Sequence, residues 1–309
     1  MPVQGPIHVD RPLTNISIAY QSAGLIADQI FPVVPVKKET DLYSIFDKAN
    51  SMRTPDSLRA NGAEANEDHM VLSTASYRLE EHSLKEIITD RDRDNADEAI
   101  NLEMSTVEDL TGKIQREREV DAASLLFTNG NWANESSLAA AAAWSANTTV
   151  SNPILNADSA ASTVNQQAGV RPNLCVIDYR TWLAAKEHTS VVQRVMYTSA
   201  DSVSEAMLAR LFGVQRLLVA SGSQNADDEG LAANMQNIWT DSAWFGYVNP
   251  SPGIKRLSAL VAFKKSGGGV EVRRWRDDPR KGEWFEVGHM YDQHCPASDA
   301  GYLVVNPVQ

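Results

Sequence analysis

The longest regular pattern of apolar and polar positions in this chain is helical and covers residues 95–127. Apolar side chains recur there at spacings of three and four, which is typical of a helix with one buried face. They are Ala96, Ala99, Ile100, Met104, Val107, Leu110 and Ile114. Asp94 or Asn95 can cap the start, and Asn129-Gly130 supplies a left-handed stop. The pattern predicts a rod of about 48 Å, at ~1.5 Å per residue.

The apolar stripe of this helix is interrupted halfway along. Gly112 lies mid-helix, where glycine costs about 1 kcal/mol relative to alanine. A run of four charged residues follows at 116–119 before apolar positions resume. We therefore predict a buried first half and then an exposed charged segment that other subunits can contact.

The segment before the helix divides into an arm and a hairpin. Residues 1–36 contain five prolines around one short helical stretch at 17–28, so we expect this arm to lie over a neighbouring subunit instead of burying itself. Residues 41–46 and 70–80 alternate as strands do, with a polar tip at 50–69 between them. An isolated two-stranded hairpin is marginally stable in water, so it too needs a partner surface.

The remainder of the chain mixes helices and strands without a regular βαβ repeat. Asn152 and Pro153 open a helix that Gly169 closes, and a capping box at Ser202 and Glu205 opens another that Gly213 closes. A further helix is expected at 179–188. Strands are predicted at 174–177, 216–220, 237–240, 260–264, 270–276, 284–291 and 302–305. This order indicates an α+β fold.

Composition narrows the classes of function. The net charge of −12 argues against a dedicated nucleic-acid binder, which needs a basic patch to replace the counterions of phosphates. The two cysteines are too few for a disulfide framework. No signal peptide is expected, and no apolar run approaches the ~18 residues needed to span a membrane.

Candidate chemistry is sparse. His289, Asp292, His294 and Cys295 are the only close group of ligand-type side chains, but the two histidines point to opposite faces of a strand. Trp275 and Trp284 lie among arginines, and we interpret them as a cross-strand pair covered by alkyl stems rather than a stacking platform for bases. We expect no catalytic residue, no metal and no cofactor. A metal-dependent enzyme that uses residues 289–295 is the remote alternative.

Several segments resemble the major capsid protein of tailed bacteriophages. They are Ile18-Ala19-Tyr20 with 25–36 (LIADQIFPVVPV), the helix Leu102–Phe127 with REVDAA at 118–123, and the segments 174–197 and 208–222. These segments occur in the order found in that family, so the resemblance covers nearly the whole chain.

The resemblance implies the tailed-phage capsid fold, in which the chain divides into four parts. Residues 1–36 would form an extended N-arm, and residues 37–82 a projecting β-hairpin loop. Residues 83–132 and 254–296 would form a peripheral domain that contains the long spine helix. Residues 133–253 and 297–309 would form a mixed α/β axial domain.

The resemblance also implies a structural subunit of an icosahedral virion capsid. Copies would self-assemble into hexamers and pentamers in the host cytoplasm and enclose double-stranded DNA in weak, non-specific contact. Because no long segment precedes the arm, we expect a separate scaffolding protein, together with a portal protein and decoration proteins. The candidate subunit contacts are Ile18, Tyr20, Phe31, Met52, Arg53, Leu58, Arg59, Arg116, Arg118 and Glu119. The alternative of the same fold is a nanocompartment shell around enzyme cargo.

Overall fold

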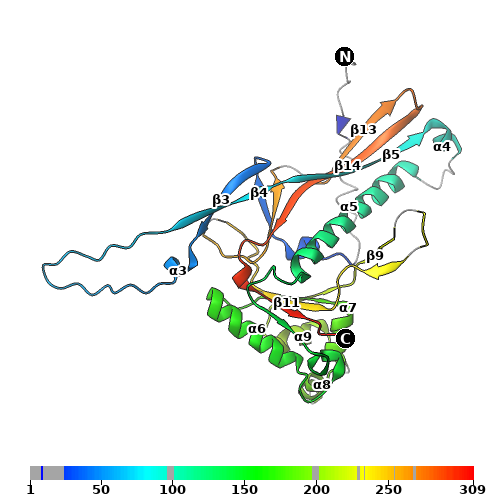
Figure 1. Cartoon of the computed structure of the whole chain (residues 1–309). Coiled ribbons are helices and arrows are strands. Elements are labelled where there is room, and N and C mark those ends of the chain that lie inside the picture. Colours follow the sequence, from blue (N-terminus) through cyan, green and yellow to red (C-terminus); the bar gives the residue numbers. More distant parts are fainter. Residues whose placement is uncertain are drawn as a thin grey trace.

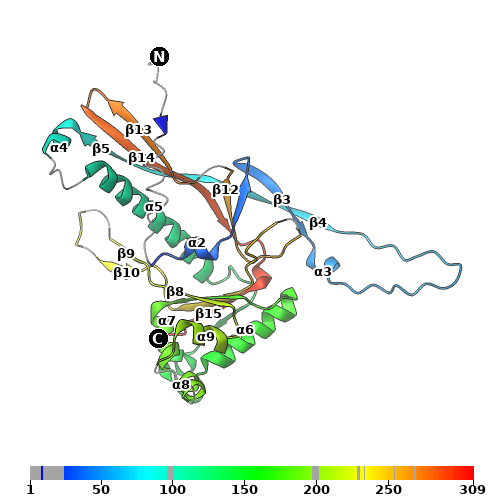
Figure 2. The ribbon, with the colours of Figure 1, turned by 180° about the vertical axis from the view of Figure 1, so that it is seen from behind.

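A computed structural model describes residues 8–9, 24–95, 101–196, 202–227, 230–232, 234–253, 255–266 and 269–309. The molecule is elongated: two sheets follow one another along its length, and a hairpin projects to one side (Figures 1 and 2). Helices and strands are mixed, which confirms the predicted α+β class.

The first sheet has six strands and is built around β14 (Gly282–His294). One edge of β14 pairs with β5 (Glu80–Thr89), and the other pairs with β13 (Glu271–Asp277) and then β12 (Val261–Lys265). β1 (His8–Val9) and β2 (Val33–Val36) complete the sheet at its two ends. The hairpin of β13 and β14 confirms the predicted pair, since Trp275 faces Trp284 with ring centroids 6.3 Å apart.

Helix α5 (Leu102–Phe127) lies against one face of this sheet (Figure 1). Its residues Val107, Leu110 and Ile114 are buried with Phe285 and Val287, as the apolar stripe predicts. The predicted start is wrong. The described helix begins after Asn101, whose side chain accepts a hydrogen bond from Met104 N at 3.2 Å, while residues 90–95 form a separate short helix, α4 (Asp90–Asn95). Residues 96–100 lie outside the described part.

Ion pairs attach α4 to the elements around it. Arg276 contacts Asp90 at 2.6 Å, and Arg93 contacts both Glu103 and Glu283 at 2.9 Å. These pairs fix α4 to β13, β14 and the start of α5, which a periodicity pattern does not reveal.

The second sheet has five strands in the order β6, β15, β11, β7, β8. They are β6 (Glu135–Ser137), β15 (Gly301–Val305), β11 (Ser242–Gly246), β7 (Leu174–Asp178) and β8 (Arg216–Ala220). The helices of this part are α6 (Pro153–Ala168), α7 (Tyr179–Glu187), α8 (Thr189–Val195) and α9 (Glu205–Leu211). Short 3-10 helices are η1 (Ala140–Ala142), η2 (Trp144–Ala146) and η3 (Ser298–Ala300).

Two predicted boundaries in this part need correction. Ser204, not Ser202, caps α9, because its side chain accepts from Met207 N. Of the strand predicted at 237–240, only Asn237 lies in a strand, as the last residue of β10 (Met235–Asn237), which pairs with β9 (Ser223–Asn225). By contrast, Asn152 caps α6 and Gly169 closes it at φ 69°, as predicted.

The end of the predicted arm belongs to the core of its own subunit. Helix α2 (Ala27–Ile30) and Phe31 pack with Ala122 and Leu126 of α5, and both Ile30 and Phe31 are 0% exposed. β2 then pairs in parallel with β12 at the edge of the six-stranded sheet, where a proline is tolerated. The expectation that residues up to 36 do not bury themselves is therefore wrong for Ile26, Ala27, Ile30 and Phe31, while 33–36 form an edge strand that is only partly buried. Most of the stretch 17–28 lies outside the described residues.

The projecting hairpin is confirmed. β3 (Thr40–Phe46) pairs with β4 (Leu72–Arg78) in antiparallel register, and a one-turn helix, α3 (Lys48–Ser51), follows β3. Every residue from 51 to 74 is exposed. In the part of the chain that the structure describes, no helix has both the length and the apolar character needed to cross a bilayer.

The positions of the two sheets in the sequence can be compared with the predicted division of the chain into four parts, which itself stays a prediction. The five strands of the second sheet all fall within 133–253 and 297–309. The six-stranded sheet draws on 83–132 and 254–296 but also includes β1, β2 and the first residues of β5.

Candidate assembly surface

The hairpin presents apolar side chains to solvent along its length, from β3 to the tip. Leu58 at the tip is 86% exposed and Leu42 on β3 is 64% exposed. Further exposed apolar side chains of this hairpin are Met52, Met70, Val71 and Leu72. Among the described residues the two strands pair only with each other, so most of the backbone groups along their outer edges have no strand partner. Apolar side chains next to open strand edges are the properties of a protein-binding surface.

An aromatic cluster fixes the root of this hairpin. Tyr77 stacks on Phe263 of β12 with ring centroids 4.6 Å apart, and Tyr43 contacts Phe263 at 5.6 Å. Tyr77 and Phe263 are each 6% exposed. The inner ends of β3 and β4 are therefore anchored on the six-stranded sheet, while the outer ends are not.

Met52, Arg53, Leu58 and Arg59 lie on this exposed part of the hairpin, where the sequence places them. Arg116 is exposed on α5. Ile18 and Tyr20 lie outside the described residues. Their roles as subunit contacts remain a prediction.

Three other candidate contacts are inside the subunit. Phe31, Arg118 and Glu119 are 0%, 3% and 0% exposed, so the expected charged outer segment of α5 is wrong for Arg118 and Glu119. The signal was present in the spacing, because Arg118 follows Ile114 and precedes Ala122 by one turn each and so falls on the buried stripe.

The buried carboxylate of Glu119 joins three elements. It accepts hydrogen bonds from Ile26 N at 2.9 Å, Ala27 N at 2.8 Å and Trp239 Nε1 at 2.7 Å. Burial raises the pKa of Glu119, while these donors and Arg118 act in the opposite direction. This carboxylate thus holds α2 and the segment before β11 against α5.

Arg118 occupies the neighbouring position and pairs with Asp28 of α2. Burial would raise the pKa of Asp28, but Arg118 and Lys264 lower it below its usual value. The guanidinium also lies 5.4 Å from the ring of Tyr291 on β14. The charges of Arg118 and Glu119 therefore make contacts inside the subunit, whereas Arg116 and Glu117 remain on its surface.

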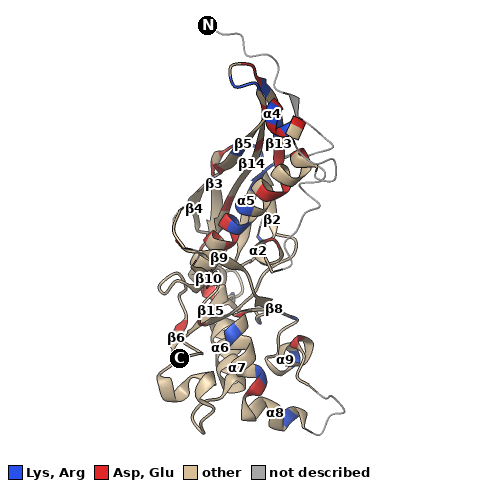
Figure 3. Ribbon diagram, turned by 90° about the vertical axis from the view of Figure 1, so that its right-hand side faces the viewer, with Lys and Arg blue, Asp and Glu red and all other residues tan. Residues whose placement is uncertain are grey.

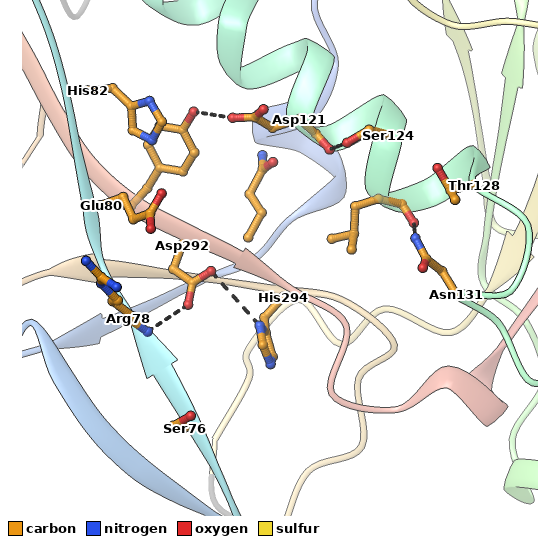
Figure 4. Close-up of a pocket in the computed structure, with 13 residues that line it drawn as sticks. Ser76, Arg78, Glu80, His82, Asp121, Ser124, Thr128, Asn131, Asp292 and His294 are labelled. Carbon is orange, nitrogen blue, oxygen red and sulfur yellow. Dashed lines mark hydrogen bonds and ion pairs between the residues drawn. The ribbon is translucent and has the colours of Figure 1, made fainter.

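An open polar groove of about 720 Å³ lies between the hairpin root, β14 and the end of α5 (Figure 4). Tyr291 Oη donates to Asp121 at 2.9 Å, and the ring of His82 stacks on Tyr291 at 4.6 Å. Asp292 accepts a hydrogen bond from Arg78 N at 3.0 Å. Sequence reasoning missed this groove because its walls come from β4, β5, α5 and β14. Several of its side chains contact one another, and none of the hydrogen bonds among these lining residues joins a serine or threonine hydroxyl to a histidine or a carboxylate.

Of the group at 289–295, only Asp292 and His294 lie within ion-pair distance of each other, at 4.0 Å. His289 contacts Tyr291 at 5.1 Å, and burial lowers the pKa of His289 to about 3. His294 instead contacts Tyr43 at 5.9 Å, and burial raises the pKa of Cys295 to about 12. Within the described residues, no three His, Cys, Asp or Glu side chains are placed to hold a metal ion.

Basic and acidic residues are interspersed over the six-stranded sheet and α5 (Figure 3). Arg274, for example, contacts Glu103 at 3.2 Å, and Arg276 contacts Asp90. Arginines that the sequence groups together are thus neutralised by acids of other elements, which gives no basis for a strong DNA-binding patch.

No protein-family model matches the chain. Full-length relatives do exist among curated proteins. The major capsid protein of Pseudomonas phage JBD67 is 28% identical over 98% of this chain and 98% of its own length. The major capsid protein of Burkholderia phage BcepMu is 27% identical over 96% of this chain and 95% of its own. The chain is thus similar to phage major capsid proteins over nearly its whole length.

Solved structures agree in fold. A phage-related protein from Bordetella bronchiseptica RB50 superposes with a TM-score of 0.77 at 21% identity, covering 98% of this chain and 99% of that one. The capsid of a native GTA particle gives a TM-score of 0.61 at 16% identity, over 93% and 91% of the two chains. The fold is therefore that of the tailed-phage capsid proteins, as predicted.

Proposed function

We propose that this chain is the structural subunit of an icosahedral phage capsid, which self-assembles into hexamers and pentamers around double-stranded DNA. The observation that carries the proposal is the 28% identity to a phage major capsid protein over 98% of both chains. The exposed, apolar hairpin supports it, since a shell subunit must offer surfaces that only its neighbours cover.

The finer assignments belong to the same proposal. Residues 37–82 would be the extended loop, 83–132 with 254–296 the peripheral domain, and 133–253 with 297–309 the axial domain. Contacts between subunits would involve Ile18, Tyr20, Arg116 and the hairpin residues Met52, Arg53, Leu58 and Arg59. The exposure of the hairpin residues and of Arg116 supports this selection.

Other partners follow from the role of a capsid subunit. A scaffolding protein, a portal protein and decoration proteins would take part in assembly in the host cytoplasm, and the finished subunit would reside in the virion. The net charge of −12 supports weak, non-specific contact with the packaged DNA.

Electron microscopy of the purified full-length chain tests the proposal. We expect closed shells, formed alone or after co-expression with neighbouring phage genes, whereas a variant with Leu58, Met70 and Leu72 changed to Ser should stay folded and unassembled. A matched control is Val150→Ser, which removes an exposed apolar side chain far from the hairpin. Particles that contain enzyme cargo and never DNA would instead indicate a nanocompartment, which no present observation favours over a capsid. A protein that stays monomeric under all these conditions would contradict the proposal.

A further inference from the structure

The hairpin contacts its own subunit at a second place beyond the aromatic root. Lys48, the first residue of α3, donates from Nζ to Asp299 Oδ2 at 2.8 Å and to Gln167 Oε1 at 3.3 Å. Asp299 lies in η3 and Gln167 in the last turn of α6, so both partners belong to the five-stranded sheet and its helices. The root, by contrast, is anchored on the six-stranded sheet.

Local features hold α3 in position for this contact. Asp47 caps α3 by accepting from Asn50 N at 2.8 Å, which forms the turn before Lys48 reaches outward. Gly169, which ends α6 at φ 69°, leaves room for Met52, whose methyl group lies only 3.0 Å from where a β-carbon at Gly169 would be. We call Lys48, Met52, Gln167, Gly169 and Asp299 the clip.

Beyond the clip, the hairpin touches only itself within the described residues. Asn66 Nδ2 donates to Asp56 O at 2.7 Å, and Asn50 Nδ2 donates to His69 O at 2.7 Å. The position of the whole tip is therefore set by the buried aromatic root, by the exposed polar clip and by Lys255, whose Nζ lies 5.2 Å from the ring centroid of Phe46 at the outer end of β3.

We propose that the clip sets the angle of the hairpin to the five-stranded sheet and opens readily, so that the hairpin pivots about its aromatic root. Lys48 and Asp299 have side chains 42% and 38% exposed. An ion pair in such contact with water shifts an equilibrium by about five-fold at most, and salt screens it further. Closed and open positions are thus both populated in solution.

A hairpin whose angle to the five-stranded sheet can change would let one subunit fit different positions in a shell. One chain that occupies both hexamers and pentamers must fit neighbours in more than one orientation. This consequence rests on the proposed function, whereas the pivot itself is a property of the free subunit.

The test measures the distance between two spin labels in unassembled full-length subunits. Spin labels are placed at Asn61→Cys on the tip and Asp158→Cys on α6, both exposed positions, in a Cys295→Ser background. We expect a main distance with a minor broad component in the parent protein. Lys48→Ala and Asp299→Asn should each enlarge the broad component several-fold, and the charge swap of Lys48→Asp with Asp299→Lys should restore the parent distribution.

The matched control is Lys38→Ala. It removes an ion pair of similar kind, with Asp41 at 3.0 Å, that lies within the hairpin and does not reach the body. Lys38→Ala should leave the distances unchanged, and raising the salt concentration should broaden the parent distribution but not that of Lys48→Ala. Equal broadening in the Lys38 and Lys48 variants, or no broadening in either, would overturn the proposal. Because shells are not needed for this measurement, its failure is separate from a failure of the proposed function.

Discussion

At the scale of single residues, Glu119 is a buried side chain that connects three elements of the subunit. Its carboxylate is fully buried and accepts from two backbone amides of the α2 segment and from the indole of Trp239. Ile26 and Ala27 precede Glu119 by 93 and 92 residues, and Trp239 follows it by 120. The loss of this acceptor would affect three elements at once.

Glu119→Ala should lower the free energy of unfolding by roughly 3 kcal/mol or more, because each buried donor left unsatisfied costs about 1–3 kcal/mol. Urea titration followed by tryptophan fluorescence and circular dichroism measures the change. Glu117→Ala is the matched control, since Glu117 is one residue away, 51% exposed and pairs only with His82 among the described residues. That variant should change stability by less than about 0.5 kcal/mol. Equal effects of the two variants would show that Glu119 is not a connecting residue.

Glu283 links the stability of the six-stranded sheet to pH. Burial alone would raise the pKa of Glu283, but Arg93 and Arg274 lower it below its usual value of 4.5. A carboxyl group with a lowered folded-state pKa contributes stability above its unfolded pKa, and this contribution is lost as pH falls through the folded pKa. The effect therefore lies below pH 4.5.

Arg274→Ala should move the acid-unfolding midpoint to higher pH, because the pKa of Glu283 would rise toward that of the unfolded chain. Circular dichroism between pH 6 and pH 2 records the midpoint. Arg273→Ala, which removes exposed contacts to Glu271 and Glu286 on the other face of β13, should leave it nearly unchanged. An unchanged midpoint in Arg274→Ala would contradict this account.

At the scale of elements, the hairpin combines a stable root with an outer part that has no core. Tyr43, Tyr77 and Phe263 bury the inner ends of its strands, whereas residues 51–74 are all exposed. Segments with few buried apolar contacts open with a free energy close to zero. The hairpin is therefore expected to gain its stability from neighbours rather than from its own subunit.

Amide hydrogen exchange over residues 50–69 should be fast in free subunits and strongly slowed in assembled particles, because neighbouring subunits would cover the backbone there. The core strand β7 is the internal control and should be protected in both states, since all five of its residues are buried. Limited proteolysis after Arg53 and Arg59 should show the same contrast. Equal exchange at 50–69 in the two states would mean that no neighbour covers the hairpin.

At the scale of the whole molecule, one hydrophobic cluster joins the two sheets. It contains Leu126 of α5, Phe31 after α2, Ala262 of β12 in the six-stranded sheet, and Trp244 and Leu303 of the five-stranded sheet. A core that is shared in this way should make the two sheets unfold together rather than as independent domains.

Leu126→Ala should destabilise both sheets by about 2–5 kcal/mol, the usual cost of truncating a fully buried leucine. Hydrogen exchange of β13 and of β7 in the same sample reports the two sheets separately. We expect both to lose protection to the same extent, whereas Leu155→Ala on the exposed side of α6 should affect neither. Loss of protection in only one sheet would show that the cluster does not couple them.

The sequence by itself determined the elements whose signals are local. The alternation of apolar and polar residues predicted the strands of the hairpin. Asn152 and Gly169 predicted the limits of α6, and Trp275 and Trp284 predicted the pairing of β13 with β14. These three signals depend on backbone preferences and on the spacing of side chains within a few residues. Such local preferences are the same in any tertiary context. The resemblance of several segments to capsid proteins then supplied the fold, which full-length relatives and solved structures bear out.

Only the tertiary structure decided which partners the charged segment of α5 meets and where the end of the arm belongs. A charged run usually faces water, but Arg118 and Glu119 are buried because Asp28, the amides at 26 and 27 and Trp239 meet them there. The same contacts place Ile30 and Phe31 in the core, although the prolines around them indicate an arm. The cost of burying a charge depends on partners that are distant in the sequence, and no local pattern records which partners the fold will bring.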